Sequence, residues 1–378
     1  MPKGQTMSDK GFFAVSVPVL RRIVEAGGDA SDLMAYLVLA KHTTGWGKWK
    51  HMVSTAGAKA VSTRTGLTYR KAQARLKWLH EQGFIQPGES VEGMPAHVTG
   101  EVAHQRAATK VRWVFGKLGN RRAYLSHSLI DGVGAGKKHP PLMRLWEEVA
   151  KGPCTSFMEA RTDALLLLIH CYAEQSIQDF GGIDPEVLRR PWTGTTSATE
   201  EVLEDLGWLV MEVEQGQEST TLEFVAKVLS HAAEDSRRDR FWNAFENLKR
   251  LGFMYEVLQV WQGNPLENPR AELFYPLYVR DYHARQSDPY CQSAIHTFLT
   301  AAEYIDSCDL PLLVEDAIEH QTFRLVRAKG ESECVIGTYR LRFRPSTEDT
   351  GKGMMQEAKR AERWCNVLKK AVYERQSQ

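Results

Sequence analysis

The chain has 378 residues, of which 43% are hydrophobic and 25% charged, a composition typical of globular proteins with roughly two or three domains. No run of eighteen uncharged apolar residues is present, and no apolar stretch follows the first charges as in a secretory signal. We therefore expect a cytoplasmic protein that does not bind membranes. The six cysteines are too widely spaced for a zinc-binding pattern, so we expect buried thiols and no metal or cofactor.

Charge is distributed unevenly along the sequence. Residues 1–150 carry 22 Lys and Arg against 11 Asp and Glu, a net charge of +11. The remaining 228 residues carry 26 against 36, a net charge of −10. This asymmetry predicts a basic binding module joined to an acidic body, and a polyanion is the expected partner of the basic part.

Two helices are predicted first in chain order. Ser31 is a candidate N-cap with Asp32 in the first turn, and four apolar residues follow at helical spacing, namely Leu33, Tyr36, Leu37 and Ala40. A short second helix fits residues 55–65. Gly66 then favours a left-handed turn, Leu67 anchors it, and Thr68 is placed to cap a third helix.

The third helix has two distinct faces. Ala72, Leu76 and Leu79 form one apolar stripe, and the opposite side carries Arg70, Gln73, Lys77 and Glu81. Gly83 ends this helix, and Phe84 with Ile85 opens a strand. This order of elements is that of a winged helix-turn-helix, whose second helix reaches base edges in the major groove.

A wing is predicted over residues 84–115, with its return strand at 110–115. Four of its residues are expected to contact phosphate: His104, Arg106, Lys110 and Arg112. The alternative is a helical hairpin plus a β-hairpin used only for packing or dimerisation. Turn chemistry, the apolar stripe and the excess of basic residues together favour DNA binding.

Residues 11–90 resemble a known family in three places. These are the aromatic lead-in FFAVSVP with Pro18, the break TGWGK at 44–48, and TGLTYRKAQARLKWLHEQGFI at 65–85. They resemble the N-terminal, origin-binding domain of bacteriophage replication protein O and related winged helices of mobile elements. The resemblance implies that six residues lie on the DNA side: Arg64, Tyr69, Arg70, Lys71, Gln73 and Lys77. Thr68 joins them in the predicted contact set.

Beyond residue 150 the sequence predicts an apolar core helix at 163–180 and a short helix at 183–192. A second recognition helix with a hairpin is predicted from about residue 236, where Phe241, Phe245 and Leu248 form the buried stripe. Its candidate DNA contacts are Arg237, Arg238, Arg240, Asn243 and Asn247. Residues 151–280 carry a net charge of −9, so dimerisation or binding of a protein partner is the competing role for this region.

Towards the C-terminus we expect helices at 290–306 and 311–320, strands at 323–329 and 334–344, and a terminal amphipathic helix. Arg340, Arg342 and Arg344 alternate with apolar residues on the second strand, and Arg324, Arg327 and Lys329 lie on the first. Two interpretations of this basic face stay open, a solvated sheet surface and a patch that contacts the DNA backbone.

No catalytic pattern is found. The stretch GVGAGKKHP at 132–140 fails as a phosphate loop, because Asp131 stands where the motif needs Gly and Lys138 where it needs Ser or Thr. The sequence also lacks GxSxG and HExxH. We therefore expect no enzymatic activity.

The predicted fold class is mainly α with small β-hairpins (α+β), with tandem winged helix-turn-helix domains and a C-terminal α+β segment. The predicted division is a DNA-binding domain at 1–120, a linker at 121–150, an acidic second winged-helix-like domain at 151–284, and a C-terminal segment at 285–378. The expected function is sequence-specific binding of duplex DNA by a regulator or replication initiator of a bacterial mobile element. The alternative is an interaction or adaptor protein, for instance in phage defence, whose winged helices bind protein.

Overall fold

The computed structural model describes residues 11–44, 52–87, 113–115, 121–132, 140–153, 155–176, 182–196, 208–264, 266–267, 272–279, 322–328 and 333–343, with positions 352, 355, 356 and 359. The described part contains both helices and strands, which confirms a mixed α+β fold. Two compact units are present. The first consists of Met1–Ala173, Val225–Phe253 and Phe343–Thr347, and the second of Glu174–Phe224, Met254–Arg342 and Glu348–Gln378.

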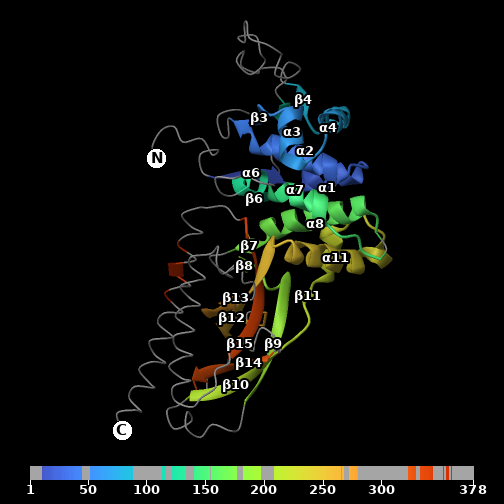
Figure 1. Ribbon diagram of the computed structural model, residues 1–378. Coiled ribbons are helices and arrows are strands. Elements are labelled where there is room, and N and C mark those ends of the chain that lie inside the picture. The colour runs from blue at the N-terminus through green and yellow to red at the C-terminus, as the bar shows by residue number, and fades with distance from the viewer. Residues whose placement is uncertain are drawn as a thin grey trace. The chain divides into compact units, whose positions relative to one another are not determined.

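The first unit is mainly helical (Figure 1). Its helices are α1 (Val17–Glu25), α2 (Ala30–Lys41), α3 (Ala58–Thr65), α4 (Tyr69–Glu81), α6 (His127–Asp131), α7 (Pro141–Glu148), α8 (Phe157–Ala173) and α11 (Arg237–Arg250). A short 3-10 helix, η3 (Glu234–Ser236), precedes α11, and α10 (Leu222–Val228) runs across the boundary between the units. Residues 225–253 thus belong to the same unit as the predicted N-terminal domain, which differs from the division expected from the sequence.

Two small sheets accompany these helices. β1 (Phe12–Ser16) pairs antiparallel with β6 (Arg122–Ser126), so that Ala14 lies opposite Tyr124. The other sheet has the order β2-β3-β5-β4, built from β2 (Thr43–Thr44), β3 (Met52–Ser54), β5 (Trp113–Phe115) and β4 (Gln86–Pro87). In this second sheet, β3 and β4 flank β5, so the chain before α3 and the chain after α4 are joined through one strand.

The core of the first unit lies around α8. Residues 164–171 of α8 are all buried, and α11 packs against this helix with Phe241, Phe245 and Leu248 buried. Thr162 Oγ1 accepts a hydrogen bond from the backbone N–H of Ala30 at 3.0 Å, which links α8 to the start of α2. The predicted core helix is therefore present, but it covers residues 157–173 instead of 163–180.

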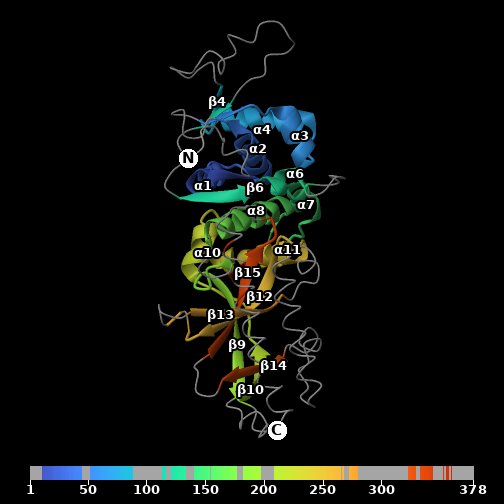
Figure 2. The same cartoon turned by 90° about the vertical axis from the view of Figure 1, so that its left-hand side faces the viewer.

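The second unit contains a seven-stranded sheet (Figure 2). Its strands are β9 (Leu188–Thr196), β10 (Trp208–Gln215), β11 (Ser219–Thr220), β12 (Met254–Gln262), β13 (Glu272–Val279), β14 (Thr322–Ala328) and β15 (Glu333–Leu341). The order is β13-β12-β15-β9-β10-β14, with β11 paired to β9, and β7 (Gln175–Ser176) pairs separately with β8 (Gly182–Ile183). The predicted hairpin after residue 253 and the two C-terminal strands are confirmed, but the sheet is far larger than the small hairpins expected.

The helix predicted at 183–192 is wrong. Asp184 accepts hydrogen bonds from the backbone N–H groups of Glu186 and Val187, at 2.8 and 2.9 Å, which forms a turn. The chain then enters β9, which pairs with β10 and β15. The conformation of residues 188–196 is therefore set by pairing with strands distant in the sequence and not by the local helical pattern.

A buried network of charged and polar groups lies on one side of this sheet. Arg190 Nε is 3.1 Å from Glu256 Oε1, and its other end pairs with Glu218. Trp192 Nε1 donates to Glu256 at 3.3 Å. A side chain at Gly337 would collide with the Glu256 carboxylate, so glycine leaves the space that this network occupies.

The basic face predicted on the last strand is not formed as expected, because Arg340 is buried together with Tyr339 and Leu341. Lys329, Arg344 and the helices predicted at 290–306 and 311–320 lie outside the described residues, while positions 352, 355, 356 and 359 are helical. Among the described residues, no helix has both the length and the apolar character needed to traverse a bilayer.

Candidate nucleic-acid interface

The turn between α3 and α4 is fixed by backbone conformation and by side-chain hydrogen bonds. Gly66 adopts a φ of 76°, in the left-handed region, as predicted. Ser62 Oγ donates to the carbonyl of Leu67 at 2.7 Å, and Thr65 Oγ1 accepts from the Leu67 N–H at 3.2 Å. Leu67 is buried. The angle between the two helices is therefore set by contacts within the turn itself.

The start of α4 presents basic side chains and the N-terminal end of the helix to the outside. Thr68 caps the helix by accepting from the Lys71 N–H at 3.3 Å, which confirms its predicted capping role. The first turn carries Arg70 and Lys71 and no acidic residue. Because the N-terminus of a helix is the positive end of its dipole, these residues increase an already positive potential, and a phosphate group is stabilised there.

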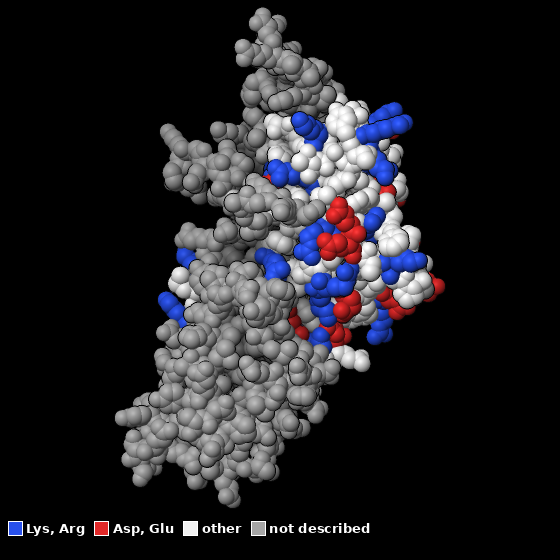
Figure 3. Space-filling view, viewed as in Figure 1, with Lys and Arg blue, Asp and Glu red and all other residues white. Residues whose placement is uncertain are grey.

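Along α4 the buried and exposed faces are those predicted. Ala72, Leu76 and Leu79 are buried, and the exposed predicted contact residues are Tyr69, Arg70, Lys71, Gln73 and Lys77. Tyr69 is 54% exposed, although it is a large aromatic residue. Figure 3 shows Lys and Arg side chains over α3 and α4 with few Asp and Glu, whereas the surface below shows both signs of charge.

Arg75, which the sequence did not single out, anchors α4 to the first turn of α2. Its Nη1 lies 3.3 Å from Asp32 Oδ2 and 3.8 Å from Asp29 Oδ2. The two aspartates form a capping box at the start of α2, so Asp29 is the N-cap and the predicted N-cap Ser31 is not. The local signal was the Asp-x-x-Asp spacing, which is a variant of the usual capping box.

Arg64 is less available than expected, because it is engaged in a shared ion pair. Its Nη1 lies 3.1 Å from Asp131 Oδ1 on α6, and Lys41 Nζ lies 2.5 Å from Asp131 Oδ2. Burial lowers the pKa of the neighbouring His42 and His127, so both imidazoles favour the neutral form. Asp131 therefore links the end of α3 to α6, and Arg64 is engaged in this ion pair in the absence of any ligand.

The predicted wing is described only in part. Trp113–Phe115 form β5, within the expected return strand, and the strand after α4 begins at Gln86 instead of Phe84. His104, Arg106, Lys110 and Arg112 lie outside the described residues, so their contacts with phosphate stay predictions.

Comparison of the chain with protein-family models, curated proteins and solved structures finds no match. The assignment of the interface therefore rests on the geometry of α3 and α4 and on the exposed residues that they present.

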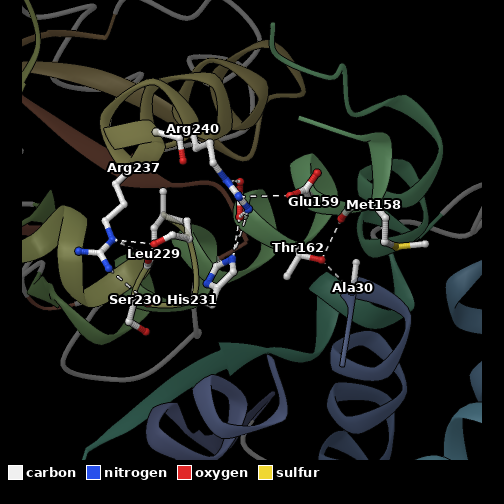
Figure 4. Close-up of polar contacts among 12 residues, drawn as sticks. Ala30, Met158, Glu159, Thr162, Leu229, Ser230, His231, Arg237 and Arg240 are labelled. Carbon is white, nitrogen blue, oxygen red and sulfur yellow. Dashed lines mark hydrogen bonds and ion pairs between the residues drawn. The ribbon is translucent and has the colours of Figure 1, made fainter. Parts of the chain in front are cut away.

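The second candidate contact set is mostly used inside the protein (Figure 4). Arg240, 8% exposed, makes a bidentate pair with Asp163, with Nε–Oδ2 at 2.8 Å and Nη2–Oδ1 at 2.9 Å, and its Nη1 lies 3.3 Å from Glu159. His231 Nε2 is also 3.1 Å from Asp163 Oδ1. The guanidinium thus joins α11 to α8 and is not available to DNA.

The other members of this set divide between internal contacts and solvent. Asn247 is 3% exposed and exchanges hydrogen bonds with both backbone groups of Ala150, at 2.8 and 2.9 Å. Arg237 donates to the carbonyls of Leu229 and Ala232, and Asn243 packs beside Gly152. Only Arg238 of the five is exposed. The prediction of a DNA-reading face on α11 is therefore wrong for Arg240 and Asn247, since burial at the contact with α8 requires polar groups with internal partners.

Among the residues described, no three His, Cys, Asp or Glu side chains are grouped so as to hold a metal ion.

The buried carboxyl of Asp32 is expected to make the stability of the folded protein depend on pH. Burial raises the pKa of this carboxyl to about 6, despite hydrogen bonds from the Asp29 N–H and from Arg75. Since the folded pKa exceeds the unfolded one, the folded state loses stability as pH rises through about 4 to 6, by about 3 kcal/mol in all. Asp32→Asn keeps an oxygen that accepts from the Asp29 N–H, so we expect it to remove this loss.

The measurement is urea unfolding of both proteins at pH 4 and pH 7. The change in the free energy of unfolding between pH 4 and pH 7 is expected to differ by about 2 kcal/mol between Asp32→Asn and the wild type. An unchanged difference contradicts the assigned role of Asp32.

Proposed function

We propose that this protein binds double-stranded DNA sequence-specifically and that α4 is the recognition helix. The observation that carries the proposal is the exposed face of α4, where Arg70, Lys71, Gln73 and Lys77 project from a helix braced by Gly66 and Arg75. By its resemblance to winged helices of mobile elements, the protein would act as a transcription regulator or replication initiator.

The side chains on this face have the chemistry that base recognition needs. A helix fits the major groove, which is about 12 Å wide. There an arginine pairs with the O6 and N7 atoms of guanine, and a glutamine pairs with the N6 and N7 atoms of adenine. Arg70 and Gln73 are three residues apart on one side of α4, so they would read neighbouring bases.

Phosphate contacts would supply most of the affinity. Lys71 lies in the first turn, where the helix dipole adds to its charge. Lys77 is exposed further along α4. Within the part of the chain that the structure describes, its ion pair is with Glu81, at 3.5 Å, a surface interaction that contributes little. Both lysines are therefore able to move to the DNA backbone at small cost.

Replacing Arg70 and Gln73 by alanine is expected to relax base preference. A bidentate contact contributes about 1–3 kcal/mol of discrimination, so each lost contact should reduce selectivity between about fivefold and a hundredfold. The measurement is selection of bound sequences from random duplex DNA, with the full chain and each variant. Arg21→Ala removes an exposed arginine of α1 in the same unit, outside both predicted contact sets, and is the matched control, which should select the wild-type motif.

Replacing Lys110 and Arg112 in the predicted wing should instead weaken binding to all sequences equally. Each lost phosphate contact should also reduce the slope of log affinity against log salt by about 0.9. If neither the full chain nor its variants enrich any motif at low salt, α4 does not read DNA, and the alternative of a protein-binding winged helix is favoured.

A further inference from the structure

Aromatic rings and basic side chains alternate on the surface formed by α7, α8 and the segment between them. This aromatic–cation row consists of Trp146, Arg161, Phe157 and Lys151. Arg161 Cζ lies over the Trp146 ring at 4.4 Å from its centroid and over the Phe157 ring at 5.9 Å. Lys151 Nζ lies over the Phe157 ring at 5.8 Å. Two cations and two rings thus lie next to one another on one surface.

Arg161 has no carboxylate partner among the residues described. Its Nε is buried and makes no hydrogen bond, and loss of hydration lowers the pKa of its guanidinium. Two carboxylates on the same helices pair elsewhere: Glu148 of α7 with Arg144 at 3.2 Å, and Glu159 of α8 with the Ser156 N–H at 2.9 Å and with Arg240 at 3.3 Å. The ring of Trp146 partly compensates the cation, and a phosphate group would complement its charge.

Phe157 is the exposed ring of the row. It is 54% exposed at the first position of α8, although most large apolar side chains of this unit are buried. The exposed Lys151 lies beside it. An open ring flanked by two cations matches what a nucleotide requires, which is a surface for its base and a charge for its phosphate.

We propose that the aromatic–cation row binds single-stranded nucleic acid, with an unpaired base stacked on Phe157 and the adjoining phosphates paired with Arg161 and Lys151. Bases in a duplex are stacked on each other, so a ring such as Phe157 gains a stacking partner only from an unpaired strand. The row therefore recognises a different form of nucleic acid from the one assigned to α4.

The two surfaces lie in the same unit, and the turn before α4 lies close to α7. A side chain at Gly66, in the turn before α4, would meet Met143 of α7 at 3.3 Å, and Trp146 is on the same helix as Met143. One unit thus carries both surfaces, so it would hold a duplex and an adjacent unpaired strand together. The row does not depend on α4, and each proposal can fail without the other.

The test is fluorescence anisotropy of labelled oligothymidylate of about 15 nucleotides with the full-length protein, and of oligouridylate of the same length. Phe157→Ala should weaken binding of the single strand about tenfold, and Phe157→Trp should restore it. Arg161→Gln should also weaken binding and reduce its salt dependence. Preference for the uridylate would identify the strand as RNA, and preference for the thymidylate as DNA.

Two controls separate this proposal from duplex recognition and from loss of folding. Tyr124→Ala removes another exposed aromatic residue of the same unit, 41% exposed, and should bind the single strand as the wild type does. The variant with both Arg70→Ala and Gln73→Ala should also bind it normally, while Phe157→Ala should select the same duplex motif as the wild type. Absence of single-strand binding, or equal binding by Phe157→Ala and the wild type, would overturn the proposal.

Discussion

Replacing Arg240 by alanine is expected to lower the free energy of unfolding by about 3–5 kcal/mol, because it leaves the buried Asp163 carboxylate without its bidentate partner. His231, at 3.1 Å from Asp163, remains as one neighbour, but it replaces neither of the two guanidinium hydrogen bonds. The measurement is equilibrium unfolding in urea, in which the midpoint should fall without a change in slope.

The neighbouring Arg238 provides the control, since it is exposed on the same helix. Arg238→Ala should change stability by no more than about 0.5 kcal/mol. A double replacement, Asp163→Leu with Arg240→Met, should recover most of the loss, because an apolar pair of similar volume leaves no buried charge. If Arg240→Ala instead weakens duplex binding at unchanged stability, α11 is a DNA-contacting helix after all.

Acidification is expected to destabilise the first unit through His170. Burial on α8, together with the charges of Arg121, Lys227 and Arg21, lowers the pKa of this imidazole to about 3. The unfolded state takes up a proton below about pH 6.5, and the folded state does not until about pH 3. Stability is therefore lost as pH falls through this window, by about 5 kcal/mol in all and about 3 kcal/mol by pH 4.

Between pH 7 and pH 4, the free energy of unfolding of His170→Leu should fall by about 3 kcal/mol less than that of the wild type. The comparison must be made between variants, because Asp32 changes stability with pH in the opposite direction and partly cancels the effect in the wild type. Equal pH dependence of His170→Leu and the wild type would show that His170 is protonated or hydrated in the folded state.

The helix-turn-helix was predictable because its signals are local. Gly66, Thr68 and the stripe Ala72, Leu76 and Leu79 each determine structure within a few residues, and all behave as expected. The α+β class was equally accessible from the alternation of helical and strand patterns. These predictions needed no knowledge of contacts across the core.

What the sequence could not predict depends on contacts between distant residues. Asp163 and Arg240 are 77 residues apart, so nothing near Arg240 indicated that it is buried. The same applies to Arg64, which meets Asp131 from another helix, and to β9, whose strand conformation depends on β10 and β15. The aromatic–cation row could not be predicted from the sequence either, because Trp146 and Arg161 belong to different helices.

The first unit is assembled from separate stretches of chain, and this has a consequence for its synthesis on the ribosome. α8 is complete at residue 173, but α11, which covers it and holds Asp163, ends at residue 250. At about 5–20 residues per second, the 77 residues between Asp163 and Arg240 take roughly 4–15 s to be made. During that interval the side of α8 that α11 covers stays exposed, so the first unit completes its core only after residue 250 has been made. A fragment that stops before α11 would keep this side of α8 exposed.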